Sequence, residues 1–484
     1  MSQRKANYIG GAWVPGEKWV ENRNPSDVAD LIGLFDQASP EMVSHAIDAA
    51  SAASRIWAQS GLEKRYSVLM AIGQELMGRA QELGSLLSRE EGKPLAEGVG
   101  EVYRSGQFFT YFAAEVLRQI GDRVDSVRDG IEIDVRREPL GVVAVISPWN
   151  FPMATASWKI APALAFGNAV IWKPANLTPA SAWALTEIIS RQDLPPGLFN
   201  LAMGTGEAIG QLLAGSPRVN GVTFTGSLEV GRRVAAAAAG NLTKFQLEMG
   251  SKNPLVIMDD ADLDLAVSVA LNGAFGGTGQ KCTASSRLIV HTKIYDVFVD
   301  RLVAGAKALR VGHALKPETQ VGPVVSATQL QSNLNYVRLA QQEGGERACG
   351  GEALERPTPG HYMAPAVILN TRNDMRVNRE EIFGPVTCLI RCDGFDEAVA
   401  TANDTPFGLT SGIVTRSLAR ASQFRRQSKA GCVMVNLPTA GTDYHVPFGG
   451  RGASSFGPRE QGRYAIEFYT QMKTSYVQPG AAAA

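Results

Sequence analysis

Residues 142–152 read Val142-Val143-Ala144-Val145-Ile146-Ser147-Pro148-Trp149-Asn150-Phe151-Pro152. The first five are all apolar, as expected for a β-strand that is buried on both faces of a parallel sheet. The Ser-Pro pair then ends the run, because Ser-Pro favours the start of a turn. This stretch therefore predicts a buried strand followed by a loop that carries aromatic and amide side chains.

Similar apolar runs alternate with helical segments further along the chain. We predict helices that begin at Thr178-Pro179 and Gly226-Ser227, and three more strands, at 169–172, 199–202 and 222–224. Strands that alternate with helices imply right-handed βαβ units in a doubly wound parallel sheet. A second αβ series has predicted strands near 254–258, 287–290 and 386–389. The predicted fold class is α/β, with two sheet domains that meet near residue 250.

The first hundred residues show mainly helical spacing. Ser39-Pro40 is predicted to cap a helix that carries Val43 and Trp57, and a second apolar stripe runs from 69 to 87. A third helix is expected over 97–117. In contrast, 131–135 and 472–477 alternate in polarity, which is typical of edge or arm strands that mediate contacts between subunits.

Charge and composition exclude several classes of partner. The 484 residues contain 47 Lys and Arg against 47 Asp and Glu, so the formal net charge is zero. A neutral chain lacks the basic surface that nucleic acids or anionic lipids require. The longest uncharged apolar stretch, 160–172, is too short to cross a bilayer. Five scattered cysteines and no secretory signal favour a cytoplasmic protein that acts on small molecules.

Cys282 is the first candidate for chemistry. It follows the glycine-rich stretch Gly276-Gly277-Thr278-Gly279. A cysteine on such a turn can be surrounded by backbone N–H groups, which favour the nucleophilic thiolate over the thiol. The alternative interpretation is a buried cysteine that serves only in packing.

Two further polar residues could act with this thiol. Glu248 lies between an apparent strand and Gly250, where partial burial would raise its pKa toward that of a general base. Asn150 follows the strand at 142–146, and its amide could donate to a developing oxyanion. The alternatives are a solvated or ion-paired glutamate and an ordinary Asx turn.

Possible phosphate sites are less specific. Gly204, Gly206 and Gly210 are spaced G-x-G-x₃-G, which differs from the dinucleotide fingerprint. Thr225-Gly226-Ser227 at the start of a helix is at least as good a site, because helix N-termini bind anions. The five histidines show no metal-ligand spacing, so no metal site is predicted. No P-loop or nucleophile-elbow motif is present, which argues against an ATPase or an α/β-hydrolase.

Seven motifs occur in the order found in the aldehyde dehydrogenase superfamily, which the chain resembles over nearly its whole length. They are Pro148-Trp149-Asn150-Phe151-Pro152, Trp172-Lys173-Pro174-Ala175, Phe224-Thr225-Gly226-Ser227, Leu247-Glu248-Met249-Gly250, Gly279-Gln280-Lys281-Cys282, Glu381-Ile382-Phe383-Gly384-Pro385 and Pro447-Phe448-Gly449-Gly450. The resemblance implies a Rossmann-type cofactor domain over 1–118 and 140–249 and an α/β catalytic domain over 250–465. A small β oligomerisation arm would comprise 119–139 and 466–484, and would build a homodimer or homotetramer.

The resemblance also implies a mechanism. Cys282 would attack the aldehyde, while Asn150 and the Cys282 N–H hold the oxyanion, and Glu248 would activate the water that hydrolyses the thioester. Lys159 would lie near the active site, in a proton relay. Among the cofactor residues, Lys173 and Glu381 would hold ribose hydroxyls, Ser227 the pyrophosphate, and Phe383 would pack beside the nicotinamide. The cofactor set is Ser147, Pro148, Trp149, Lys173, Ala175, Asn176, Gly206, Phe224, Thr225, Gly226, Ser227, Glu381 and Phe383.

Departures within the family pattern predict specificity. Many NAD-preferring members have a glutamate where this chain has Asn176, so NADP should be accepted and preferred over NAD. The segment 436–450 resembles the branch that oxidises the anionic α-ketoglutaric semialdehyde to 2-oxoglutarate. Trp158 stands where succinic semialdehyde dehydrogenases have an arginine, so Arg104 becomes the candidate for the substrate carboxylate. The predicted substrate set is Arg104, Trp158, Thr283, Tyr444 and His445.

Other functions stay open at this point. The chain could oxidise succinic semialdehyde or a broad range of aldehydes, since these enzymes differ only in the substrate tunnel. A CoA-acylating semialdehyde dehydrogenase is disfavoured because such members typically lack the glutamate at 248. A non-catalytic binding protein is disfavoured because the cysteine, glutamate and asparagine are all present.

Overall fold

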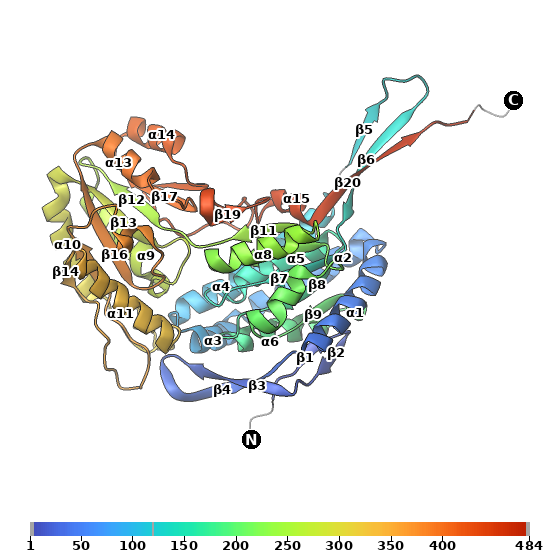
Figure 1. Cartoon of the computed structure of the whole chain (residues 1–484), viewed down its shortest axis with the longest axis horizontal. Helices are drawn as coiled ribbons and strands as arrows, with labels where there is room; N and C mark the ends of the chain where they lie inside the picture. Colours follow the sequence, from blue (N-terminus) through green and yellow to red (C-terminus); the bar gives the residue numbers. More distant parts are fainter. Residues whose placement is uncertain (1–3, 119–120, 481–484) are drawn as a thin grey trace.

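The computed structural model describes residues 4–118 and 121–480 (Figure 1). The first three residues of the predicted cofactor domain lie outside these ranges. The same holds for residues 119–120 and 481–484 of the predicted arm. Two large sheets, each with helices packed around it, form the body of the molecule, and an antiparallel arm projects from it beside the C-terminus (Figure 1).

The first sheet has eight strands, in the order β19-β11-β10-β7-β8-β9-β1-β2. The central strand β7 (Val142–Ile146) is buried throughout and pairs in parallel with β8 and β10, as its apolar run predicts. The predicted strands at 169–172, 199–202 and 222–224 are confirmed to within one residue. The other strands are β1 (Asn7–Ile9), β2 (Ala12–Val14), β8 (Ala169–Lys173), β9 (Phe199–Leu201), β10 (Gly221–Thr225), β11 (Lys244–Glu248) and β19 (Ser455–Phe456).

The helices around this sheet correct one prediction. The apolar stripe at 69–87 is not one helix, because the chain turns at Arg79, whose guanidinium binds the carboxylates of Glu75 and Glu82. The predicted third helix is confirmed as α4. The helices are α1 (Pro40–Ala58), α2 (Leu62–Gly78), α3 (Ala80–Glu91), α4 (Leu95–Val116), α5 (Ala154–Ala165), α6 (Pro179–Ser190), α7 (Gln211–Gly215) and α8 (Leu228–Gly240), with a π-helical turn at 206–210.

The expectation of a mainly helical first hundred residues is wrong for the segment before residue 38. Strand β1 adds to the edge of the first sheet, with Tyr8 opposite Leu201. Strands β3 (Lys18–Asn24) and β4 (Asp27–Gln37) form a separate antiparallel ribbon. Strands β1 and β2, like β3 and β4, pair as local hairpins, which helical spacing cannot detect.

The second sheet has seven strands, in the order β14-β15-β16-β13-β12-β17-β18. Its predicted strands near 254–258, 287–290 and 386–389 are confirmed as β12 (Asn253–Ile257), β13 (Ser285–His291) and β16 (Val386–Cys392). The remaining strands are β14 (Glu346–Cys349), β15 (Ala366–Leu369), β17 (Thr410–Val414) and β18 (Cys432–Val435). The helices of this half are α9 (Leu263–Phe275), α10 (Tyr295–Ala308), α11 (Ala327–Gln342), α12 (Arg376–Arg379), α13 (Phe395–Asn403) and α14 (Leu418–Gln427).

The arm is a three-stranded antiparallel sheet. It consists of β5 (Asp122–Asp125), β6 (Glu132–Pro139) and β20 (Thr470–Val477), in the order β20-β6-β5. The short helix α15 (Ile466–Tyr469) leads into β20. Both segments that alternate in polarity are thus strands of this arm, as predicted. The role of this arm in oligomerisation and the bounds of the three predicted domains stay predictions.

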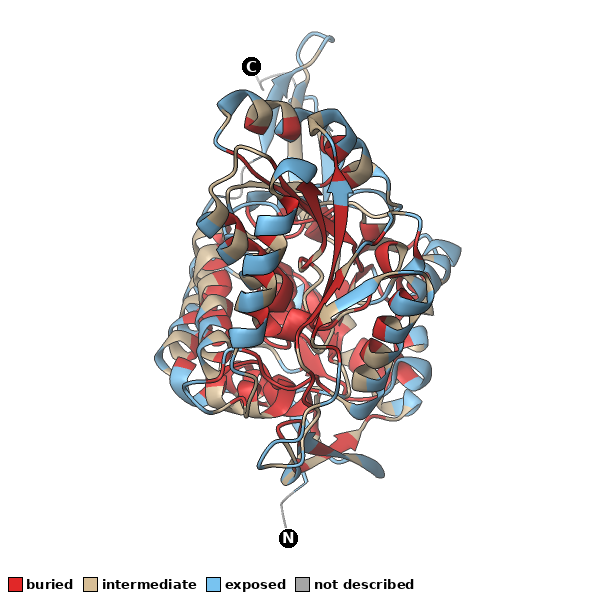
Figure 2. Cartoon of the chain, turned by 90° about the vertical axis from the view of Figure 1, so that its left-hand side faces the viewer, coloured by how far each residue is buried: buried red, intermediate tan, exposed pale blue. Residues whose placement is uncertain are grey.

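The core runs through both sheets, and buried strands lie inside a shell of exposed helix faces (Figure 2). In the first sheet, β7, β10 and β11 are parallel, so their carboxyl ends lie at one edge. Asn150, Thr225 and Glu248 all lie at or just beyond these ends. The segment with Cys282 leads into β13 of the second sheet. The two sheets therefore bring their polar residues to a common boundary.

Candidate active site

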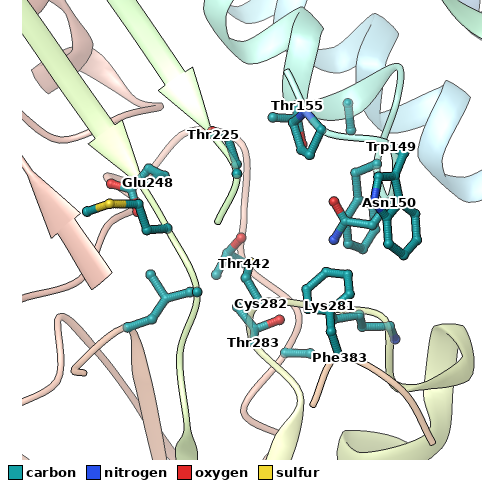
Figure 3. Close-up of a pocket in the computed structure, with 18 of the residues that line it drawn as sticks. Trp149, Asn150, Thr155, Thr225, Glu248, Lys281, Cys282, Thr283, Phe383 and Thr442 are labelled. Carbon is teal, nitrogen blue, oxygen red and sulfur yellow. The ribbon is translucent and has the colours of Figure 1, made fainter. Parts of the chain in front are cut away.

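A cavity of about 730 Å³ lies between the two sheets. Glu248 and Asn150 lie on opposite sides of Cys282 in this cavity (Figure 3). Many of the predicted site residues line it, namely Arg104, Pro148, Trp149, Asn150, Trp158, Thr225, Gly226, Ser227, Glu248, Cys282, Thr283, Glu381 and Phe383. The lining does not include the other predicted site residues, Ser147, Lys159, Lys173, Ala175, Asn176, Gly206, Phe224, Tyr444 and His445.

The turn before Cys282 needs glycine at one position in particular. Gly279 has φ +65°, and a Cβ on it would lie 2.2 Å from the carbonyl oxygen of Gly384. An L side chain at this position would therefore force the two segments apart. Asn253 Nδ2 also donates to the carbonyl oxygen of Cys282, at 2.7 Å. The turn thus holds Cys282 in a defined place at the cavity wall.

The ionisation of Cys282 differs from the prediction of a thiolate. Removal from water raises the pKa of the thiol well above its usual value, and the Glu381 and Glu248 carboxylates raise it further. The Cys282 backbone N–H lowers the pKa, as the glycine-turn argument expects, but its effect is smaller. In this structure the thiol, and not the thiolate, is the favoured form.

Glu248 ends β11 and is almost completely buried. Ser455 Oγ donates to its Oε2 atom at 2.5 Å. Burial raises the pKa of Glu248 well above its usual value, and the charge of Glu460 adds to this increase, which the Ser455 hydrogen bond partly opposes. The expectation of a desolvated glutamate with a raised pKa is therefore met. Such a carboxylate can accept a proton near neutral pH.

Behind Glu248 lies a buried polar cluster that contains Lys159. Lys159 Nζ forms an ion pair with Glu460 and donates to Thr223 Oγ1 at 3.0 Å. Gln246 Nε2 donates to the same Glu460 carboxylate at 3.1 Å. Lys159 and Glu460 are both at most 1 % exposed. Glu460 was not found from the sequence because it lies 301 residues from its partner lysine.

Asn150 is held beside the cysteine segment. Its Nδ2 atom donates to the carbonyl oxygen of Gln280 at 2.9 Å, two residues before Cys282. Its own carbonyl oxygen accepts from Lys93 Nζ at 2.6 Å. An amide Nδ2 has two N–H groups, so one remains available after the bond to Gln280. That group can donate to an oxygen atom bound near the thiol.

An aldehyde dehydrogenase family model matches residues 13–475. The chain belongs to the aldehyde dehydrogenase family. It is 40 % identical over 477 residues to the α-ketoglutaric semialdehyde dehydrogenase of Bacillus subtilis (strain 168), with 98 % of both chains covered. The crystal structure of betaine aldehyde dehydrogenase from Staphylococcus aureus in complex with NAD⁺ superimposes with a TM-score of 0.96 at 33 % identity, covering 99 % of this chain and 96 % of that one. An NADP-dependent enzyme from E. coli superimposes with a TM-score of 0.94 at 34 % identity, and 98 % of each chain is covered.

This aldehyde dehydrogenase is therefore an oxidoreductase that acts on aldehydes, uses NAD(P) and has the family's catalytic cysteine. No helix in the described part of the chain is long and apolar enough to cross a membrane. Within the same ranges, no group of three or more His, Cys, Asp or Glu side chains is placed to hold a metal ion.

The residues of this aldehyde dehydrogenase that are predicted to bind the cofactor present groups that suit a dinucleotide. Gly226 precedes Ser227, which caps the N-terminus of α8, a position that suits an anion. Trp149 and Phe383 meet edge to face, with ring centroids 5.3 Å apart. Glu381 Oε1 accepts from the Ser251 N–H at 2.9 Å, and burial raises the pKa of Glu381 to about 7. These groups fit a phosphate, an aromatic ring and a hydroxyl donor.

Lys173 lies at the carboxyl end of β8, outside the cavity lining. Its Nζ atom donates to the carbonyl oxygen of Pro174 at 3.0 Å, its one hydrogen bond within the described ranges. Burial lowers the pKa of Lys173 to about 8. Ala175 and Asn176 are half-buried next to it, while Gly206 is exposed at the start of the π-helical turn. Gly210 of that turn packs against the Lys173 stem, so these residues form one surface.

Ser147 Oγ accepts from the indole of Trp172, at 2.8 Å, and Phe224 is buried under Gly226.

At the substrate end, Arg104 lies over the ring of Tyr444, with 5.4 Å between guanidinium carbon and ring centroid. Arg104 has no ion pair among the residues that the structure describes. Trp158 packs against Phe448, with ring centroids 5.6 Å apart. His445 is exposed beside Tyr444.

The structure adds cavity residues that the sequence reasoning missed. Lys281 lines the cavity, and its nearest carboxylate, that of Glu97, is 3.9 Å away. Glu101 also lines it and is paired with Lys93. The motif around Cys282 contains Lys281 but did not indicate where its side chain points. No local signal predicted the pair of Lys93 and Glu101.

Proposed function

We propose that this enzyme oxidises α-ketoglutaric semialdehyde to 2-oxoglutarate. The observation that carries the proposal is Arg104, a cavity cation that has no ion pair among the described residues, whereas the second cavity cation, Lys281, is 3.9 Å from the carboxylate of Glu97. An aldehyde that bears a carboxylate at its far end would complete such a site. The relative from Bacillus subtilis, whose name states this activity, supports the same substrate.

The proposed reaction begins at Cys282. The thiol loses its proton to Glu248, the sulfur forms a bond to the aldehyde carbon, and the carbonyl oxygen becomes an oxyanion. The free N–H of Asn150 Nδ2 and the backbone N–H of Cys282 would donate to that oxygen. Bound NAD(P) supplies the acceptor for the hydride of the aldehyde carbon. What is left on the enzyme is a thioester at Cys282.

Hydrolysis completes the proposed cycle. Glu248, deprotonated again, takes a proton from water, whose oxygen attacks the thioester carbon. The carbon–sulfur bond breaks, the acid leaves, and the sulfur takes up a proton. Lys159 and Glu460, buried behind Glu248, would pass the excess proton away from the site. In total, aldehyde, water and oxidised cofactor give acid, reduced cofactor and two protons when the acid product is ionised.

The cofactor would be bound at the surface made by Lys173, Ser227 and Glu381. We propose that NADP is preferred over NAD, because Asn176 presents no carboxylate that would repel a 2′-phosphate. Lys173, whose ammonium has one hydrogen bond to a carbonyl, can also attract that phosphate. A preference of tenfold or more for NAD in kcat/KM would contradict this assignment.

One observation favours a second substrate. Trp158 and Phe448 pack together beside the cavity with Phe108, and aromatic rings of this kind can bind a quaternary ammonium group such as that of betaine aldehyde. The neighbouring Arg104 argues against a cationic substrate because like charges repel. A neutral, broad range of aldehydes is the remaining alternative.

A substrate panel tests the proposal. We would measure kcat/KM for α-ketoglutaric, succinic and glutaric semialdehydes, betaine aldehyde and simple aliphatic aldehydes, each with both cofactors and without CoA. The proposal predicts the highest kcat/KM for α-ketoglutaric semialdehyde with NADP. A higher value for betaine aldehyde or for an uncharged aldehyde would overturn the substrate, and a requirement for CoA would overturn hydrolysis.

A further inference from the structure

A second buried ion pair lies beside the site, apart from the one that contains Lys159. Lys93 Nζ is 2.6 Å from Glu101 Oε2, and these residues are 2 % and 5 % exposed. Lys93 follows the end of α3, while Glu101 lies in the second turn of α4. Nothing in the proposed chemistry yet uses this pair.

Both members of the pair bind the backbone of the segment that contains Asn150. Lys93 Nζ donates to the carbonyl oxygen of Asn150 at 2.6 Å. Glu101 Oε1 accepts from the N–H groups of Met153 and Ala154, at 3.0 and 3.1 Å. One ion pair therefore fixes the segment 150–154 at both ends, and its carboxylate also lies at the N-terminus of α5, where a negative charge is stabilised.

The contacts exclude a direct role for Glu101 in catalysis, although it lines the cavity. Its Oε1 atom already accepts two backbone hydrogen bonds, and its Oε2 atom accepts from Lys93. Lys93 does not line the cavity, and its ammonium lies over the ring of Phe151, 4.1 Å from the centroid. The pair can thus act on a reacting group only through the backbone that it holds.

The backbone that the pair holds is the one that aims the Asn150 amide. An oxyanion donor is effective only when it already points at the place where charge develops. A displacement of about 1 Å can cost a hundredfold in rate. A buried ion pair is seldom needed for stability, because apolar residues of similar volume often serve equally well. The hydrogen bonds that Lys93 and Glu101 make to 150–154 do what apolar residues could not.

We propose that Lys93 and Glu101 are positioning residues that hold the amide of Asn150 in place for the oxyanion. This inference rests on the proposed role of Asn150. It predicts that Lys93→Met lowers kcat by about 10- to 100-fold, in the range that follows the loss of an oxyanion donor, while KM for the cofactor changes by less than about threefold. The cofactor surface at Lys173 and Ser227 has no contact with the pair.

Alkylation of Cys282 separates positioning from general damage. Displacement of iodide from iodoacetamide by a thiolate develops no oxyanion, so it needs the cysteine and not the Asn150 amide. The inactivation rate of Lys93→Met by iodoacetamide should therefore stay within about twofold of that of the wild type, while kcat falls. Lys64→Met is the matched control, because this exposed lysine pairs only with Asp193, and its kcat should not change.

Three results obtained with folded variants would overturn the inference. They are a kcat of Lys93→Met within twofold of the wild type, a loss of alkylation in parallel with kcat, and a full kcat in a folded double variant. The double variant, Lys93→Met with Glu101→Met, removes both charges of the pair, leaves the buried Glu91 with its hydrogen bond from the backbone N–H of residue 93, and serves if the single variant does not fold. A folded double variant with reduced kcat and normal alkylation supports the inference. Failure of the double variant to fold would show that the pair is structural and would also overturn it.

The same experiments separate this inference from the proposals on which it rests. Full activity of Asn150→Ala would remove the oxyanion role itself. Wild-type enzyme without activity on any aldehyde would contradict the proposed function and not the positioning role. An active wild type, an impaired Asn150→Ala and an unimpaired Lys93→Met together would refute the positioning role and leave the proposed function and the oxyanion role of Asn150 in place.

Discussion

At the scale of single residues, the thiol of Cys282 is the group whose chemistry differs most from the sequence-based expectation. Burial and two carboxylates raise its pKa, so the protonated form is favoured at neutral pH. The nucleophile therefore has to be generated during the reaction, and Glu248, which lines the same cavity and acts electrostatically on the thiol, is the group that we propose to accept the proton. This places the same glutamate in both halves of the proposed cycle.

The raised pKa predicts the pH dependence of alkylation. Because the thiolate fraction grows tenfold per pH unit below the pKa, inactivation of the cofactor-free enzyme by iodoacetamide should accelerate from pH 6 to pH 9 without a plateau. Glu381→Gln removes the charge that raises this pKa most, and should accelerate inactivation at pH 7 several-fold. A plateau below pH 8 would show that the thiolate is already stabilised.

Glu248→Gln tests the role of the base in hydrolysis. Glutamine cannot accept a proton, so hydrolysis of the thioester should slow by about 10²- to 10⁴-fold. If deprotonation of the thiol tolerates the change at alkaline pH, stopped-flow mixing there should show a burst of one reduced cofactor per site, followed by slow turnover. Steady turnover at the wild-type rate would contradict the role of Glu248.

The variant Ser455→Ala tests the role of Glu248 as a base by changing the pKa of its carboxyl group. The hydrogen bond from Ser455 lowers the pKa of Glu248, so Ser455→Ala should raise it. The carboxylate form would then be lost at a higher pH as the solution is acidified. The acid limb of the kcat profile should therefore move to higher pH, with little change of kcat on its plateau.

At the scale of elements, the backbone of the turn before Cys282 is tightly constrained. An alanine at Gly279 would need a left-handed backbone, which costs about 1–2 kcal/mol, and its Cβ would meet the Gly384 carbonyl. We expect Gly279→Ala to lower both Tm and kcat, the latter by more than tenfold. Gly240→Ala is the control, because a Cβ there meets nothing within 4 Å and alanine favours the helix. Equal effects of the two changes would contradict the constraint.

Some strands and helices could be predicted from the sequence, and others could not. Strands with unbroken apolar runs, such as β7 and β8, were predicted to within one residue because both faces are buried. Strands β1 to β4 were missed because this segment was interpreted from helical spacing, whereas it forms two local hairpins, β1 with β2 and β3 with β4, and β1 also pairs with the distant β9. The split between α2 and α3 was missed because the apolar stripe continues across Arg79.

The residues of the candidate site also fall into those that the sequence predicted and those that it did not. Residues within contiguous motifs, such as Cys282 and Glu248, could be selected from the sequence. The partners that tune them could not, because Glu460 and Glu101 are brought to the site only by the packing of distant elements. The raised pKa of Cys282 was not predicted because its main cause, burial, and the charge of the distant Glu381 both arise only from the packing of the two sheets.

At the scale of the whole molecule, the arm is the surface from which we predict a homodimer or homotetramer. Strand β20 pairs only with β6, and its outer edge is free in the described structure. Met472 and Tyr476 are exposed on it. An unprotected strand edge is a template for pairing with another chain. Light scattering after size exclusion should show an oligomer for the wild type and smaller species for Met472→Asp with Tyr476→Asp. A monomeric wild type would contradict the prediction.

The cavity of this neutral chain is lined by two cations, Arg104 and Lys281, among the carboxylates of Glu97, Glu101, Glu248 and Glu381. The formal net charge is zero, yet Arg104 and Lys281 both face the space between the two sheets. Selection of an anionic aldehyde therefore depends on these side chains and not on the overall field. Replacing one of them should affect a charged substrate and leave an uncharged one unaffected.

The most direct test compares two aldehydes in two proteins. We would measure kcat/KM for α-ketoglutaric semialdehyde and for pentanal, which has the same chain length and no charge, in the wild type and in Arg104→Gln. The wild type should prefer the semialdehyde, and the variant should lose about 10- to 100-fold of that preference, in keeping with a charged hydrogen bond of about 1.5–3 kcal/mol. An unchanged ratio in Arg104→Gln, or a wild type that prefers pentanal, would contradict the account.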